Sequence, residues 1–276
     1  MTAKLQKLQK LHTVESRQEV VATLREHLRR REGVAREGSA RVGVGSALRG
    51  SGCAAVDRLL PERGFPAGTL VEWLSSDEQA SGAGTLALVA ARAAAERDGA
   101  IVVLDRRRTF YPPAAAALGL ELKRVLVVRT RTVDDELWAC DQALRCSGVA
   151  AVWGALNKLN QRWFRRLQLA AEAGGGIGHL LRPAQVLGRS SWSYAQLLVQ
   201  PRVAGSPRTG SQMRSTGGGR QWRIEVTRCQ GLARSQAVEV ELDDLGILRE
   251  TIHETHALPL ASQLAHSATH RRSAGA

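Results

Sequence analysis

One stretch of the chain, from Asp77 to Thr85, has the setting of a phosphate-binding loop but lacks the residue on which that chemistry depends. Such a loop has the pattern G-x-x-x-x-G-K-[ST] between a strand and a helix, where backbone amides hold phosphate and the lysine reaches the outer phosphates. Here Gly82 stands at the second glycine, whereas Asp77 replaces the first glycine and Ala83 replaces the lysine. Gly84 stands at the hydroxyl position, and Thr85 comes one residue too late. The pattern predicts a nucleotide-binding setting that has lost its nucleotide chemistry.

Two further features weaken nucleotide binding at this stretch. Asp77 and Glu78 add negative charge where a triphosphate would lie, and like charges ~4–6 Å apart repel by on the order of 1 kcal/mol in a partly dry site. The strand expected over 149–153 ends in Trp153, where a magnesium-binding carboxylate is usual. Tight binding of ATP by the usual route is therefore not expected. The alternative interpretation is an ordinary turn that never bound nucleotide.

A residue in the place of a general base, Asp105, follows the next apolar run but is itself followed by three arginines. Ligands of open α/β sheets bind at this carboxyl edge of the strands. The arginines are therefore candidate contacts for DNA or a partner, with a solvated loop as the alternative: Arg106, Arg107 and Arg108. Phe110 and Tyr111, with the two prolines after them, indicate packing into the next helix, and base stacking is the alternative.

These residues must be positioned by a sheet. Between residues 53 and 183, apolar runs typical of buried strands alternate with helices of about ten residues. This order predicts an α/β fold with a mainly parallel twisted sheet covered by helices on both faces. Strands are expected at 69–74, 100–104, 124–129, 149–153 and 177–181, and helices at 84–95, 112–118, 132–144 and 160–173.

The pattern changes after Pro183. Trp222, Ile224 and Val226 alternate with polar residues, which indicates a strand with one buried face. Strands at 197–200, 221–227 and 237–242 are expected to extend the sheet in antiparallel fashion. The Gly- and Ser-rich loop between the first two, and the strand after it, carry arginines that would attract a polyanion: Arg202, Arg208, Arg214, Arg220 and Arg223.

The chain divides into four parts by composition. Residues 1–32 predict a separate N-terminal helix with a narrow apolar stripe, which docks either on a partner or on its own domain. Residues 33–52 are Gly/Ser-rich and predict a linker, residues 53–250 the core domain, and residues 251–276 a disordered tail.

The net charge of +13, carried mostly by arginine, favours a polyanionic partner such as nucleic acid. A GC-rich genome that encodes arginine for lysine is the alternative explanation. No apolar run is long enough to span a membrane, and the N-terminus does not have the pattern of a secretory signal, so a cytoplasmic protein is expected. The four cysteines have no metal-site spacing, and the seven histidines do not cluster with cysteines or carboxylates at such spacing. His253 and His256, three residues apart, could bind a metal weakly, but a solvated tail is the favoured interpretation, so neither a metal nor a cofactor is expected.

The helix expected over 160–173 begins with a basic and aromatic group of residues. Trp163 and Phe164 lie among its arginines, which favours contact with nucleic acid or a partner, and simple helix amphipathicity is the alternative. The candidate contacts are Arg162, Arg165 and Arg166.

Residues 53–242 resemble the RecA recombinase core in the order of their elements, including the loop at 77–85 and the run AIVVLD. Within that superfamily the chain is most similar to the ImuA family, which is grouped with the SulA-type division inhibitors. Three strings carry this closer resemblance: DRRRTFYPPAAAALGL (105–120), FRRLQLAAEAGGGIGHLLRP (164–183) and WRIEVTRCQG (222–231).

The resemblance implies a RecA-like fold without ATPase residues and a nucleoid-associated accessory role in SOS-induced mutagenic translesion synthesis and DNA repair. The implied partners are an ImuB-like inactive relative of the Y-family polymerases, RecA and an error-prone replicative-type DNA polymerase, with DNA as a further candidate. Two rival functions stay open. One is an atypical DNA-stimulated NTPase that uses Lys123 or Lys158 from elsewhere in the chain, and the other is a SulA-like division inhibitor.

Overall fold

The computed structural model describes residues 47–76, 82–95, 99–202, 220–232, 234–243 and 245–251. Several predicted features lie outside these residues: the helix over 1–32, most of the linker, Asp77 and Glu78 of the loop, Arg208, Arg214 and almost all of the tail. Within the predicted linker, β1 (Leu48–Arg49) pairs with β2 (Phe65–Pro66) in a small two-stranded sheet.

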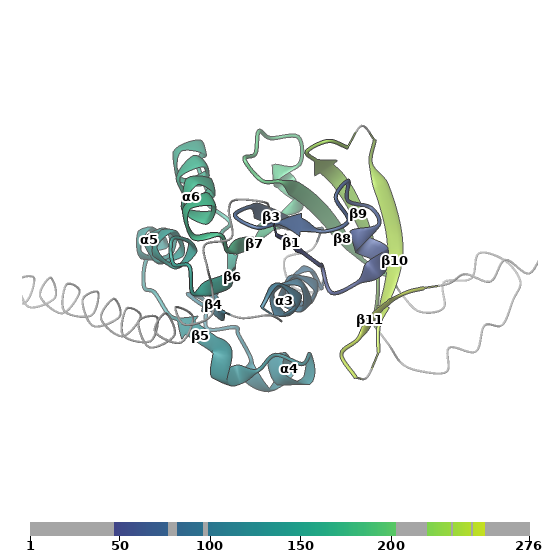
Figure 1. Ribbon diagram of the computed structural model, residues 1–276, viewed down its shortest axis with the longest axis horizontal. Coiled ribbons are helices and arrows are strands. Elements are labelled where there is room, and N and C mark those ends of the chain that lie inside the picture. The colour runs from purple at the N-terminus through teal and green to yellow at the C-terminus, as the bar shows by residue number, and fades with distance from the viewer. Residues whose placement is uncertain are drawn as a thin grey trace, which may run out of the picture.

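A nine-stranded sheet forms the centre of the molecule (Figure 1), in the order β11-β10-β9-β8-β3-β7-β6-β4-β5. Its parallel part confirms the predicted α/β class. The parallel strands are β3 (Leu70–Ser75), β4 (Ala100–Leu104), β5 (Val125–Val128), β6 (Val149–Ala155), β7 (Ile177–Pro183) and β8 (Ala195–Arg202). The antiparallel strands are β9 (Arg220–Cys229), β10 (Gln236–Leu242) and β11 (Leu248–Glu250).

Helices cover both faces of the parallel strands (Figure 1). On one face lie α3 (Ala83–Ala94) and α4 (Pro112–Ala117), and on the other lie α5 (Val133–Leu144) and α6 (Gln161–Gly174). The short helix α2 (Ala54–Asp57) lies near β10 and β11, and two 3-10 turns occupy Leu122–Arg124 and Ala184–Val186. The helices on each face of the sheet pack against it through a separate hydrophobic cluster, so the core has two layers, one on either side of the sheet.

Local side chains explain where the helices on the second face begin. The Thr132 side chain accepts a hydrogen bond from the backbone N–H of Asp135, as predicted for a helix start at this residue. The Asn160 side chain does the same for Trp163 at the start of α6. Helix α6 ends at Gly174 and is capped by Gly175, whose φ of 79° is the left-handed conformation that glycine adopts most readily.

One topological prediction was wrong. The strand expected at 197–200 was assigned to the antiparallel set, but β8 runs parallel to β3 and is antiparallel only to β9. The chain returns from the end of β7 to the start of β8 through residues 184–194, which are long enough to cross back to the opposite edge of the sheet. Antiparallel pairing therefore begins one strand later, at β9. Strand β11 was not predicted.

Candidate functional site

The described residues of the predicted phosphate loop, 82–85, lie at the carboxyl edge of the parallel strands, where α3 begins after β3. Gly82 caps α3 in the left-handed conformation, with φ at 76°. Ala83, which replaces the lysine, is buried in the core at 3% exposure, while Gly84 and Thr85 are half-buried in the first turn of α3. Ala83, at the lysine position, therefore packs in the core beneath α3.

An indole ring occupies the space beside Gly82. Trp222 of β9 is 3% exposed, and a Cβ built on Gly82 would lie only 2.0 Å from Trp222 Nε1. Both this contact and the positive φ require glycine at position 82. The sequence pattern placed Trp222 on a buried strand face but gave no sign that its ring meets the loop.

A second indole ring, that of Trp153 on β6, contacts the described residues of the loop. Trp153 donates a hydrogen bond from Nε1 to the carbonyl of Gly84 at 3.1 Å, and its ring centroid lies 6.2 Å from that of Phe110. The two tryptophans, Phe110 and Ala83 belong to one hydrophobic cluster. Phe110 thus packs in the core as predicted, whereas Tyr111 is exposed. At the position where a magnesium-binding carboxylate is usual, Trp153 ties β6 to the first turn of α3.

Asp105 is committed to building a turn. Its Oδ1 accepts hydrogen bonds from the backbone N–H groups of Thr109 at 2.7 Å and Phe110 at 3.2 Å. Its Oδ2 lies 3.6 Å from Nε of Arg129. The turn also holds Arg108 at a φ of 56°, which non-glycine residues adopt rarely. The buried carboxylate at this edge therefore organises the turn that carries the three arginines.

The three arginines of this turn have different surroundings. Arg106 donates from Nε to Oε2 of Glu136 on α5 at 2.8 Å, while Arg107 and Arg108 are exposed. Burial raises the pKa of Glu136, and the hydrogen bond and charge of Arg106 oppose that rise. Arg106 is thus engaged within the protein, and the two exposed arginines are the better placed to meet a partner.

The arginines of α6 also divide. Arg166 and Arg145 both form paired hydrogen bonds with the carboxylate of Asp141, which is fully buried. Burial raises the pKa of Asp141, but the hydrogen bonds from Arg166 and then Arg145 outweigh it, so the net pKa is lowered. Arg165 lies over the ring of Trp192 at 4.6 Å from its centroid, and Arg162 is exposed. Arg166 is structural, whereas Arg162 and Arg165 face outward.

Three more of the candidate arginines lie far along the sheet from α6, and one of them, Arg202 of β8, pairs with Glu239 of β10 at 2.8 Å. Arg220 is exposed at the start of β9, and Arg223 is half-buried opposite Glu239 of β10. Because β3 and β8 separate β9 from β7, the structure does not bring these arginines together with those of α6. The candidate arginines therefore form no single patch.

A buried carboxylate on the central strand was not identified from the sequence. Glu72 of β3 is 1% exposed, and its two oxygens accept hydrogen bonds from four side chains. Its partners are Arg182 at 2.9 Å, Ser191 at 2.6 Å, Ser193 at 3.0 Å and Gln196 at 2.6 Å. The available signal was one acidic residue within the apolar run LVEWL, since a buried carboxylate requires partners of this kind. Glu72 fastens the segment after β7 to the sheet.

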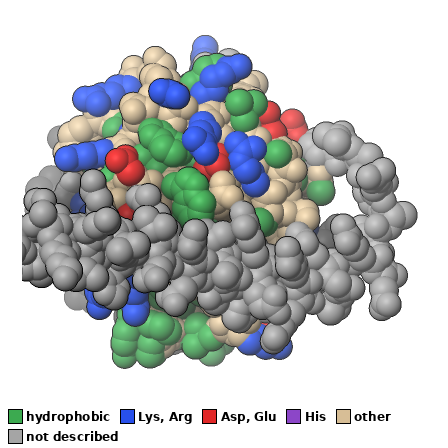
Figure 2. Space-filling view, turned by 90° about the vertical axis from the view of Figure 1, so that its left-hand side faces the viewer, with side chains coloured by type: hydrophobic (Ala, Val, Ile, Leu, Met, Phe, Trp, Pro, Cys, Tyr) green, Lys and Arg blue, Asp and Glu red, His purple; other side chains and the backbone are tan. Residues whose placement is uncertain are grey.

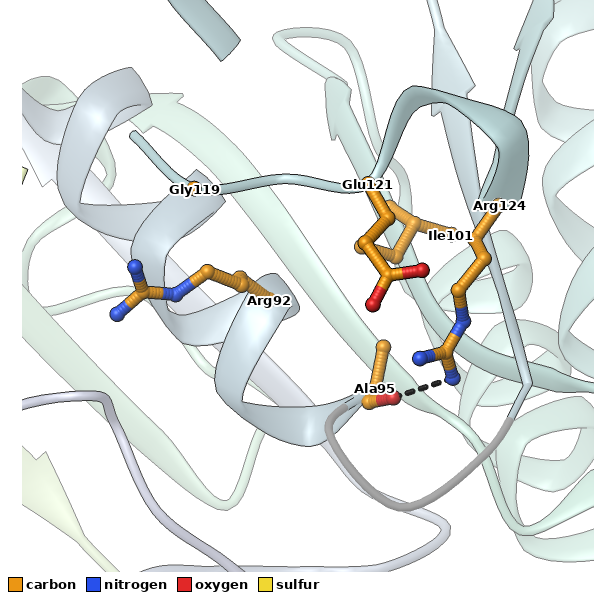
Figure 3. Close-up of a pocket in the computed structure, with 6 residues that line it drawn as sticks. All are labelled: Arg92, Ala95, Ile101, Gly119, Glu121 and Arg124. Carbon is orange, nitrogen blue, oxygen red and sulfur yellow. Dashed lines mark hydrogen bonds between the residues drawn. The ribbon is translucent and has the colours of Figure 1, made fainter. Parts of the chain in front are cut away.

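A hollow of about 390 Å³ lies at the opposite edge of the sheet, lined by Arg92, Glu121 and Arg124 (Figure 3). Arg92 donates to the carbonyl of Leu118 at 2.8 Å, and Arg124 donates to the carbonyls of Gly99 at 3.1 Å and Ala95. These guanidinium groups tie loops together. Lys123 precedes β5 at this same edge, so it lies across the sheet from Gly82, whereas Lys158 follows β6 at the loop's edge.

His179 of β7 is fully buried beneath α3, where the indole of Trp73 donates to its Nδ1 at 3.2 Å. Burial lowers the pKa of His179 from 6.5 to about 3. Among the described residues, no group of His, Cys, Asp and Glu is arranged to hold a metal, and the four cysteines are free thiols. His179 is therefore a neutral core residue.

We expect this burial to make stability depend on pH. Below pH 6.5 the unfolded chain takes up a proton that folded His179 does not, so the free energy of unfolding falls as the pH falls towards 3. Between pH 7 and 5 the loss from this residue is about 2 kcal/mol. Urea denaturation of the wild type and of His179→Gln at pH 7 and pH 5 measures this loss. The other groups titrate in both proteins, so the difference between their pH dependences is the contribution of His179. An equal pH dependence in the two proteins would contradict the assignment.

The comparisons with known proteins agree with this architecture. Two curated relatives, each named Protein ImuA and from two strains of Caulobacter vibrioides, are 30% identical to the chain over 223 residues, which is 76% of this chain and 87% of each relative. The crystal structure of the RadB recombinase superposes with a TM-score of 0.55 at 13% identity, over 74% of this chain and 100% of that one. No protein-family model matches the chain. The RecA-like fold is confirmed, and no helix in the described part of the chain could cross a membrane.

Proposed function

Because the chain belongs to the ImuA family, we propose that it is a non-catalytic RecA-like accessory protein of SOS-induced mutagenic translesion DNA synthesis. In this proposal it acts through surfaces that bind partner proteins and DNA, and no chemical step occurs on it. It works in the cytoplasm, at the nucleoid. Its partners are an ImuB-like inactive polymerase relative, RecA and an error-prone replicative-type polymerase.

The observation that carries the proposal is the filling of the loop site by two indoles. A phosphate needs open backbone amides, a cation and room, and its magnesium needs a carboxylate. Trp222 lies against Gly82, Trp153 bonds the first turn of α3, and Ala83 is buried where the lysine would be. These contacts support a packed surface in the place of a nucleotide pocket.

Titration with ATP and magnesium tests the non-catalytic part. We expect no saturable binding below about 1 mM, a concentration that corresponds to about −4 kcal/mol of binding free energy. The ring of Trp153 lies beside the loop, so tryptophan fluorescence reports on binding directly, and calorimetry provides an independent measurement. Lys158→Ala is the informative variant and Lys123→Ala its matched control, since only Lys158 lies at the loop's edge. Micromolar binding that Lys158→Ala removes would instead establish an atypical NTPase.

A cellular experiment tests the pathway. Deletion of the gene is expected to bring the damage-induced mutation frequency down towards the uninduced level, and the full chain supplied in trans is expected to restore it. Unchanged mutagenesis in the deletion strain, together with filamentous cells on overexpression, would favour a division inhibitor and overturn the proposal.

A further inference from the structure

We propose that the outer face of α6, together with Trp192, binds an acidic amphipathic segment of a partner protein. This surface, the α6 surface, consists of Arg162, Arg165 and Leu169 of α6 and Trp192 of the segment after β7. The inference rests on the proposed function, because it specifies the binding chemistry of one of the partner-protein contacts through which the chain would act.

Trp192 is held outward by its two neighbours. Ser191 and Ser193 both donate to the buried carboxylate of Glu72, at 2.6 Å and 3.0 Å. The residue between them therefore points away from the sheet, and Trp192 is 42% exposed. Gln161 adds a further tie, because it donates from Nε2 to the carbonyl of Ser190 at 2.6 Å. An exposed indole held by a buried hydrogen-bond network is preorganised for contact, which lowers the entropy lost on binding.

The helix continues this surface with residues of the same two kinds. The guanidinium carbon of Arg165 lies 4.6 Å from the ring centroid of Trp192. Arg162, three residues before Arg165, and Leu169, four residues after Arg165, lie on the same face of the helix. Leu169 is 47% exposed. Figure 2 shows the side of the molecule that carries α5 and α6, where hydrophobic side chains lie among several Lys and Arg side chains. Trp and Arg, together with Tyr, are the residues most enriched at the energetic centres of protein interfaces.

The charge of the surface identifies the class of occupant. The buried acidic groups of the adjoining elements are engaged: Asp141 by Arg145 and Arg166, Glu136 by Arg106, and Glu72 by Arg182. On α6 itself, the exposed Glu172 accepts a hydrogen bond from Gln168 at 3.0 Å. The long segments of this chain outside the described residues, 1–46, 203–219 and 252–276, each contain more Lys and Arg than Asp and Glu. They are repelled by a basic surface, so the complementary occupant is an acidic segment of another protein.

The apolar residues favour a protein segment over a nucleic acid. Leu169 offers no stacking surface for a base, and the guanidinium of Arg165 already covers one face of the Trp192 ring. A helical segment with leucine or phenylalanine at spacings of three and four, flanked by Asp and Glu, matches both the apolar and the cationic groups.

Binding of a synthetic peptide to the full-length protein tests the inference. The probe is a fluorescent acidic amphipathic peptide of about 18 residues, or five helical turns, and the controls are a scrambled peptide of the same composition and an oligo-dT of about 20 nucleotides. We expect the wild type to prefer the probe over the scrambled peptide by about tenfold. Arg165→Glu, Arg162→Glu and Trp192→Ala are each expected to weaken probe binding by about tenfold or more.

Matched surface changes elsewhere separate the surface from general charge and hydrophobicity. Arg131→Glu and Leu245→Ala alter exposed residues of other segments, between β5 and α5 and between β10 and β11, and are expected to leave probe binding unchanged. Equal losses in Arg165→Glu and Arg131→Glu would overturn the proposal, as would a wild type that does not distinguish the probe from the scrambled peptide. Loss of oligo-dT binding alone in the α6 variants would assign the surface to nucleic acid and also overturn it.

The cellular assay separates failure of this inference from failure of the proposed function. We expect Arg165→Glu not to restore damage-induced mutagenesis in the deletion strain and Arg131→Glu to restore it. If both variants restore it, the pathway assignment stands and the α6 surface is not the contact. If deletion itself has no effect on mutagenesis, the proposed function fails whatever the peptide shows.

Discussion

Replacing Glu72 with alanine is expected to lower the free energy of unfolding by about 3–5 kcal/mol. The change removes a buried carboxylate that satisfies Arg182, two serines and Gln196, and it leaves the Arg182 side chain, 9% exposed, without its counter-ion. Burial lowers the pKa of Arg182 even with Glu72 present, so a charge here already lacks the solvation of water. Urea denaturation at pH 7 measures the loss.

The matched control for this prediction is Glu225→Ala. Glu225 is half-buried on β9, and its Oε1 accepts a hydrogen bond from the hydroxyl of Ser235 at 2.7 Å, so we expect a loss of about 0.5 kcal/mol or less. Similar losses for the two variants would show that the Glu72 network does not stabilise the fold. Because Glu72 also holds Ser191 and Ser193, its replacement is expected to weaken peptide binding at the α6 surface.

Replacing Trp222 with alanine is expected to lower the free energy of unfolding by about 3–5 kcal/mol, the usual effect of removing a large buried aromatic ring. The ring belongs to the core cluster that joins β9, β8 and α3, and it lies directly against Gly82. Trp192→Ala is the control of the same type, and its effect is expected to be about 1 kcal/mol or less because Trp192 is 42% exposed. A loss at Trp222 no larger than that at Trp192 would contradict the packing described.

The same variant tests the reason for the expected absence of ATP binding. We expect Trp222→Ala to remain without micromolar ATP binding, because Ala83 still provides no cation and Trp153 no carboxylate. Micromolar binding in Trp222→Ala, measured by calorimetry, would show instead that the indole ring alone closes a competent site.

The parallel sheet could be predicted from the sequence because its signal is local. The run AIVVL at 100–104 is apolar throughout and forms β4 with all five residues buried, as a strand covered on both faces must be. Alternation in β9 correctly predicted that Trp222, Ile224 and Val226 share a buried face. The direction of β8 was not available in this way, since neither its composition nor its length distinguishes parallel from antiparallel pairing.

The candidate site was predictable in position but not in its contacts. The Asp77–Thr85 motif predicted a strand, loop and helix at a sheet edge, and the described part of that element, from Gly82 onward, lies there. That Trp222 fills the space beside Gly82 depends on β9, which is far away in the chain. Likewise, Arg106 and Arg166 read as free cations in the sequence, and only packing against α5 pairs them with Glu136 and Asp141.

By itself, the sequence determined the α/β class, the place of the loop and the lack of a lysine in it, because these depend on residue type and on the spacing of neighbours. The tertiary structure alone decided which arginines face outward, how Glu72 holds Trp192 at the surface, and which rings close the loop. Contacts of this second kind join residues 25 to 140 positions apart, counted from Asp141 to Arg166 and from Gly82 to Trp222. Burial, not sequence spacing, sets the partners of such residues, since a buried charge or ring must find its complement wherever the fold places one.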